Sequence, residues 1–149
     1  MAIIRISKSF YFEMAHALWN HDGSCRHIHG HSFELLVTIK GSPNMQPKHP
    51  KNGMVWDFSA LKEVIEQEVI RNFDHALLLN ADSKNMSETE NLQMFDRVVF
   101  VDYQPTCENI LLDIVERIKN HLPADLKLCC LKLSETPFDF AQWYADDNE

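Results

Sequence analysis

The sequence predicts an α+β fold in which helices cover one face of an antiparallel sheet. Runs rich in β-branched and aromatic residues lie near both ends of the chain, which is typical of strands. Two segments between them carry apolar residues at helical spacing. Strands and helices are thus partly segregated along the chain, which favours this class. At 149 residues, we expect a single domain spanning residues 1–149.

The first two predicted strands bracket a histidine-rich loop. The run IIRI leads into FYFEMAHAL, and both are rich in β-branched and aromatic residues. The run HSFELLVTIKG alternates apolar and polar residues from Phe33 until it stops at Gly41. We expect these two strands to form an antiparallel pair. Three prolines and two asparagines in SPNMQPKHPKNG then predict a loop over residues 42–53.

The first predicted helix follows this loop, with Asp57 or Ser59 as its N-cap. Its apolar residues recur at helical spacing: Leu61, Val64, Ile65, Val69 and Phe73. The polar residues 80–96 predict a long loop, and RVVFVDY at 97–103 predicts a short strand.

The second predicted helix begins after Thr106, which stands where an N-cap belongs. Pro123 ends the helix. Its apolar residues keep the i, i+3, i+4 spacing: Ile110, Leu111, Ile114, Val115, Ile118 and Leu122. LKLCCLKLSET and FDFAQWYA then predict two closing strands.

Composition excludes several classes of function. The net charge of −8 argues against a nucleic-acid partner. No apolar run approaches the length of about 18 residues that a membrane span needs. The first ten residues lack the features of a signal peptide, so we expect a cytoplasmic protein. The four cysteines form no CxxC pair, which favours reduced thiols over a disulfide framework.

His29 and His31 point to a metal site. Residues two apart on a strand project to the same face, so both imidazoles can reach one ion. Neutral imidazole suits zinc, with iron, nickel or copper as alternatives. His16 lies on the neighbouring predicted strand and would make a third ligand, leaving an open position typical of catalytic zinc. The other candidates for the third ligand are Cys25, His21 and His27.

Cys25 decides between two kinds of site. As a fourth ligand it would close the site and make it structural. As a free thiolate beside the metal it would act as a base or nucleophile. The spacing alone leaves both possibilities open.

Three further groups are candidates for chemistry, each with an ordinary alternative. Asp74 and His75 would form a pair suited to proton transfer, or a helix-end histidine beside a solvated aspartate. Glu135 would bind the N–H edge of a heterocyclic ring, or simply end a strand in water. Thr106 and Glu108 fit ordinary helix capping.

Six motifs in order resemble the family of 6-pyruvoyl-tetrahydropterin and 6-carboxytetrahydropterin synthases. They are FEMAHAL, CRHIHGHSFELLVTIKG, GMVWDFSALK, FDHALLLN, PTCENI and LSETP, and they span nearly the whole chain. The resemblance implies the tunnelling fold, in which each subunit has a four-stranded antiparallel sheet with two helices. The subunits would assemble into barrels as a homo-hexamer of two trimers, with active sites at subunit interfaces.

The resemblance also implies a role for each candidate residue. Zn²⁺ would be bound by His16, His29 and His31. The catalytic thiol would be Cys25, and a neighbouring subunit would supply a proton relay. Asp74 and His75 would form that relay. The pterin-binding residues would be Glu135, Thr106 and Glu108.

The implied substrate is dihydroneopterin triphosphate. The spacing Cys-x3-His-Gly-His favours the carboxy activity, which releases acetaldehyde and feeds queuosine and other deazapurine pathways. The alternatives are the pyruvoyl activity, a dihydroneopterin side-chain aldolase, and a structural zinc module with Cys25 as fourth ligand. Two positions depart from the family pattern: Cys107 replaces a serine or threonine, and His27 adds an imidazole.

Overall fold

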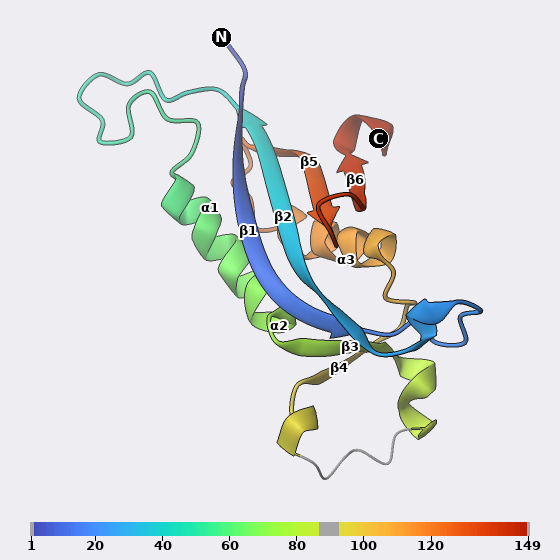
Figure 1. Ribbon diagram of the computed structural model, residues 1–149. Coiled ribbons are helices and arrows are strands. Elements are labelled where there is room, and N and C mark those ends of the chain that lie inside the picture. The colour runs from blue at the N-terminus through green and yellow to red at the C-terminus, as the bar shows by residue number, and fades with distance from the viewer. Residues whose placement is uncertain (1, 87–92, 149) are drawn as a thin grey trace.

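The computed structural model describes residues 2–86 and 93–148 (Figure 1). In this part of the chain, six strands form one curved sheet in the order β4-β3-β1-β2-β5-β6. The predicted α+β class is confirmed. The expected four-stranded antiparallel sheet is wrong in one respect, because two parallel strands extend one edge.

The antiparallel part of the sheet contains the strands that the alternation predicts. β1 (Ile4–His16) pairs with β2 (His29–Gly41) along its whole length, from Ile4 opposite Gly41 to His16 opposite His29. On the other side of β2, β5 (Lys127–Ser134) and then β6 (Phe140–Tyr144) continue the antiparallel order.

The parallel edge arises from β3 (Ala76–Asn80) and β4 (Val98–Val101). β3 pairs with the last three residues of β1, and β4 pairs with β3. The sequence predicts the strand at β4, but its pattern does not indicate a strand at ALLLN. A short apolar run directly after a helix carries no periodicity that separates a strand from a helix end. The chain changes direction at His75, whose φ is +59°.

Both predicted helices are present, and Figure 1 shows them behind the long strands β1 and β2. α1 (Phe58–Ile65) continues through a π-helical turn, η2 (Glu66–Ile70), into α2 (Arg71–Phe73). Its N-cap is Asp57, whose carboxylate accepts a hydrogen bond from the Ser59 N–H. α3 (Cys107–Lys119) is capped by Thr106 as predicted, and it ends four residues before Pro123.

The core lies between the helices and one face of the sheet. The two predicted helical stripes and alternate residues of β1, β2 and β5 contribute its side chains. Phe12 stacks on Phe33 with ring centroids 5.2 Å apart, and the two residues are paired across β1 and β2. Because alternate residues share a face, His16, His29 and His31 belong to this same face at the end of the two strands.

The remaining described segments are short. η1 (Ser24–Arg26) lies in the β1–β2 loop, and η5 (Ala145–Asp147) follows β6. The expected loop at 80–96 contains the 3₁₀ turns η3 (Ala81–Met86) and η4 (Gln93–Phe95), and residues 87–92 of that expectation lie outside the described residues.

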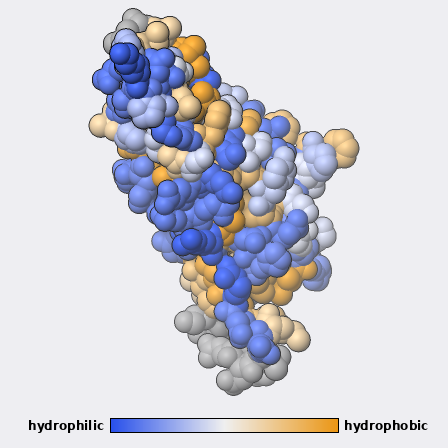
Figure 2. Space-filling model, turned by 90° about the vertical axis from the view of Figure 1, so that its left-hand side faces the viewer, coloured by the Kyte–Doolittle hydropathy of each residue, from blue (hydrophilic) through white to orange (hydrophobic). Residues whose placement is uncertain are grey.

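Hydrophilic side chains dominate much of the face of the molecule that carries α1, as expected for the outer side of an amphipathic helix (Figure 2). Within residues 2–86 and 93–148, no helix combines the length and apolar character needed to cross a bilayer.

Candidate metal centre and active site

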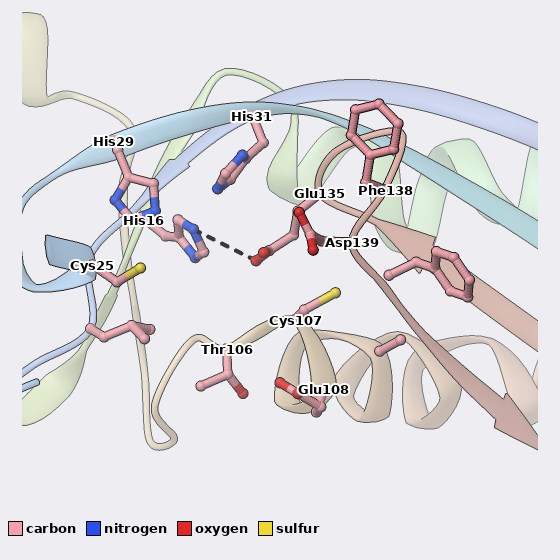
Figure 3. A pocket seen from close by; sticks show the side chains of 13 residues that line it. His16, Cys25, His29, His31, Thr106, Cys107, Glu108, Glu135, Phe138 and Asp139 are labelled. Atoms are coloured by element: carbon pink, nitrogen blue, oxygen red, sulfur yellow. Dashed lines mark ion pairs between the residues drawn. The ribbon is translucent and has the colours of Figure 1, made fainter. Parts of the chain in front are cut away.

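A cavity of about 470 Å³ opens where the apolar face of the sheet ends in histidines (Figure 3). Three parts of the chain enclose it: the ends of β1 and β2 with their connecting loop, the start of α3, and the turn between β5 and β6. Its lining residues include most of the predicted site: His16, Cys25, His29, His31, Thr106, Cys107, Glu108 and Glu135.

The three histidines lie together at one end of this cavity. A ligand nitrogen from each of His16, His29 and His31 lies within 4.8 Å of the others. The ring centroid of His16 is 4.6 Å from that of His29 and 5.2 Å from that of His31. The strand pairing explains the cluster, because His16 stands opposite His29 and His31 is two residues further along the same face.

The hydrogen bonds of the rings turn their free nitrogens toward the cavity. His16 Nδ1 lies 2.8 Å from the Pro105 carbonyl oxygen, and His29 Nδ1 lies 2.7 Å from that of His27. A carbonyl only accepts, so each Nδ1 carries the proton and each Nε2 keeps a lone pair. Among the described residues, Nε2 of His16 and Nε2 of His31 are buried with no hydrogen-bond partner. Two such orphaned nitrogens, with the imidazole of His29 beside them, fit a divalent metal ion.

Burial keeps the His16 ring neutral. The side chain is 3% exposed, and this desolvation lowers its pKa from 6.5 to about 4, with smaller contributions from His29 and His31. The hydrogen bond to Pro105 acts in the opposite direction and is weaker. A neutral imidazole at neutral pH is the form that binds a metal.

The metal-free protein is expected to lose stability as the pH falls from about 6.5 to 4. In this window His16 takes up a proton in the unfolded state but not in the folded state. Protonation therefore stabilises the unfolded state relative to the folded one. The shift corresponds to about 3 kcal/mol of unfolding free energy. The raised pKa of Glu135 acts with the opposite sign. Urea unfolding of chelator-treated wild type and His16→Gln isolates the histidine contribution: the variant should show a flatter pH dependence, and equal slopes would contradict the assignment.

Cys25 lies beside the histidine cluster without joining it. Its side chain extends into the cavity from η1 and is partly exposed (Figure 3). Among the described residues, the possible ligand atoms that lie within 4.8 Å of one another belong to the three histidines, and the Cys25 sulfur is not one of them. The geometry therefore favours an open metal position with a separate thiol over a structural zinc module.

Glu135 and the start of α3 form the opposite side of the cavity. Glu135 Oε1 lies 3.8 Å from His16 Nε2, and burial raises the pKa of this carboxyl group. Thr106 accepts a hydrogen bond from the Asn109 N–H as the N-cap of α3 and also lines the cavity, as does Glu108. This wall presents carboxylates suited to the N–H donors along the edge of a heterocyclic ring.

Cys107 also lines this wall, as a neutral thiol. Its Sγ lies 3.3 Å from the Leu133 carbonyl oxygen and donates to it. Burial, and then the charge of Glu135, raises the pKa of Cys107 to about 12. The thiol stays protonated at neutral pH and acts as a weak donor, so this position keeps a polar hydrogen where a hydroxyl was expected.

Asp74 and His75 lie outside the cavity of their own chain. His75 Nδ1 is 2.9 Å from Asp74 Oδ2, and the His75 side chain is 74% exposed. Asp74 also accepts a hydrogen bond from the Glu13 N–H, and Glu13 belongs to the sheet face opposite the core. The predicted pair therefore exists, but one chain does not bring it to the three histidines.

Sequence patterns do not point to the cavity residues in the β5–β6 turn and at the start of β6. Phe138, Asp139 and Phe140 line the cavity, and the Phe138 side chain is 87% exposed. The available signal was the aromatic–acid–aromatic run from Phe138 to Phe140, which lies close to Glu135, the residue expected to bind the ring. It was read only as the beginning of a strand.

Comparisons with known proteins agree with one another. The profile of a family described as 6-pyruvoyl tetrahydropterin synthase matches residues 5–146. A 6-carboxy-5,6,7,8-tetrahydropterin synthase of Haemophilus influenzae is 32% identical over 95% of this chain and 99% of its own. A dihydroneopterin monophosphate aldolase of Pyrococcus furiosus is 33% identical over 83% and 82%. The fold matches a Caenorhabditis elegans 6-pyruvoyl tetrahydropterin synthase structure with a TM-score of 0.68, at 23% identity over 97% of this chain and 96% of that one.

Proposed function

The chain belongs to the 6-pyruvoyl tetrahydropterin synthase family, and on this premise we propose that it is a zinc-dependent 6-carboxytetrahydropterin synthase of queuosine or related deazapurine synthesis. The substrate would be 7,8-dihydroneopterin triphosphate. The products would be 6-carboxy-5,6,7,8-tetrahydropterin, acetaldehyde and triphosphate. The observation that carries this choice is the 32% identity to the Haemophilus influenzae synthase across almost the whole of both chains.

The reaction balances without an external oxidant. The bond between the first and second side-chain carbons breaks, and the outer two carbons leave as acetaldehyde. Triphosphate departs with its bridging oxygen by elimination, and one water supplies the second carboxyl oxygen. The side chain loses two electrons in total, and the C6–N5 double bond of the ring gains them with two protons. The site therefore has to hold the ring, move protons and stabilise charge on oxygen.

The residues of the cavity suit these tasks. His16, His29 and His31 would hold the zinc ion, which supplies a Lewis acid for the side-chain oxygens of the substrate. Cys25 would remove and return protons at the adjacent side-chain carbons. Glu135 would hold the N–H edge of the pterin ring, with Thr106, Glu108 and the neutral Cys107 thiol beside it.

Asp74 and His75 would act in a neighbouring subunit. The pair is hydrogen-bonded and exposed, yet it lies outside its own cavity. A partner chain in the expected homo-hexamer would bring the pair to the thiol of the next subunit. His75 would then exchange protons with that thiol, and Asp74 would orient the imidazole.

The decisive experiment is incubation of the zinc-loaded protein with dihydroneopterin triphosphate, followed by mass analysis of the pterin and an acetaldehyde assay. A carboxy product with equimolar acetaldehyde is the expected result. A pyruvoyl product without a two-carbon fragment would replace the proposal by the pyruvoyl activity. A hydroxymethyl pterin with the triphosphate ester of glycolaldehyde would replace it by an aldolase, the class of activity named for the Pyrococcus furiosus relative.

A further inference from the structure

The loop that carries Cys25 is attached to the start of α3 through the side chain of one residue, Gln104. The Trp19 N–H donates to Gln104 Oε1 at 2.8 Å, and Gln104 Nε2 donates to the Trp19 carbonyl oxygen at 2.6 Å. A side-chain amide thus satisfies both backbone groups of Trp19, as a paired strand residue would. Most residues of this loop are exposed, so among the described residues little side-chain burial adds to these two hydrogen bonds.

Gln104 is itself held rigidly. Its carbonyl oxygen accepts hydrogen bonds from the Thr106 N–H at 2.8 Å and from Asn109 Nδ2 at 2.9 Å. Asn109 lies in the first turn of α3, and its own N–H is bonded to the Thr106 hydroxyl. The segment 104–106 is therefore fixed to the helix by hydrogen bonds that do not involve the loop.

Two branches lead from this segment to the reacting groups. In one, Gln104 holds Trp19, and the neighbouring Leu18 N–H donates to the Cys25 carbonyl oxygen at 2.9 Å. In the other, the Pro105 carbonyl accepts from the ring of His16. The thiol loop and a histidine of the metal cluster are thus oriented by adjacent residues of one short segment.

We infer that Gln104 is a positioning residue, which holds the Cys25 loop so that the thiol faces the three-histidine cluster. The inference rests on the proposed function for its effect on turnover, but its effect on the loop does not. An amide is required, because the paired contacts need one donor and one acceptor on the same planar group. A misplacement of the thiol by about 1 Å would cost on the order of 100-fold in rate.

The test compares Gln104→Ala and Gln104→Glu with wild type. Glutamate keeps the length and the acceptor but loses the donor, so it removes one half of the pairing. Gln142→Ala is a matched control, because Gln142 is an exposed glutamine on β6 away from the loop. Both Gln104 variants should keep their zinc content and thermal midpoint near wild type. The expected kcat falls by about 10- to 100-fold with KM changed by less than about threefold.

A second readout does not depend on activity. Hydrogen–deuterium exchange over residues 17–28 should be faster in both Gln104 variants and unchanged over α3, and iodoacetamide should label Cys25 faster. Unchanged exchange and labelling would overturn the inference. Faster exchange with unchanged kcat would also overturn it, because the loop would then be held without any effect on the chemistry. If wild type has no pterin activity, the proposed function fails, and exchange alone still decides whether Gln104 holds the loop.

Discussion

Replacing Cys25 with alanine is expected to lower kcat by about 10² to 10⁴-fold, the range that a positioned acid or base contributes, while leaving the zinc content per chain unchanged. The thiol lines the cavity but lies outside the group of mutually close ligand atoms, so its loss should spare the metal. Zinc by atomic absorption and turnover of dihydroneopterin triphosphate check the two halves of this expectation.

Cys107 offers a matched control for this variant. It lines the same cavity, and its pKa is raised to about 12, so it is not a thiolate at neutral pH. Cys107→Ser should keep a hydroxyl donor toward the Leu133 carbonyl and retain activity within about tenfold of wild type, since one modest hydrogen bond changes. If Cys25→Ala instead loses zinc and unfolds, the sulfur is a ligand and the structural zinc module is the correct interpretation.

Replacing His16 with alanine is expected to raise the dissociation constant for zinc by more than about 100-fold, beyond the loss that removal of an outer-sphere partner causes. Turnover should fall with it. The physical reason is geometric, because two imidazoles from β2 alone leave the ion without a ligand from β1. Competition with a chromogenic chelator measures the affinity directly.

His27→Ala is the control for the metal site. His27 contacts the cluster only through its backbone carbonyl, which accepts from His29 Nδ1 and survives the substitution. The exposed imidazole is not among the clustered ligands, so zinc affinity should stay within about tenfold of wild type, the lower end of the outer-sphere range. A large loss of zinc affinity in His27→Ala with none in His16→Ala would show that the third ligand is His27 and not His16.

The sequence was sufficient for most of the fold because its signals were periodic. Alternation over Phe33–Ile39 marked β2, helical spacing marked α1 and α3, and Thr106 marked a helix start. The sequence pattern does not indicate β3, because its four apolar residues, Ala76 to Leu79, follow a helix and have no distinguishing period. The parallel edge could not be predicted either, because it depends on where the chain returns to the sheet after the helix.

The candidate site likewise combines residues that local patterns place with a residue that they do not place. Strand period and antiparallel pairing place His16 beside His29 and His31, so local geometry alone was enough to bring the three together. Cys25 was different, because it lies in an irregular loop whose path is set by distant contacts such as that with Gln104. Spacing in the motif CRHIHGH therefore left its role open.

The sequence by itself determined the α+β class, the three histidines on two neighbouring strands, and the family that the chain belongs to, because these depend on period and motif order. Only the tertiary structure decided which groups share the cavity. It separated Cys25 from the ligand cluster, brought Glu135 within 3.8 Å of His16, and left the Asp74–His75 pair on another surface. The physical reason is that such distances are set by loop paths and by packing between segments far apart in the chain, which local patterns do not record.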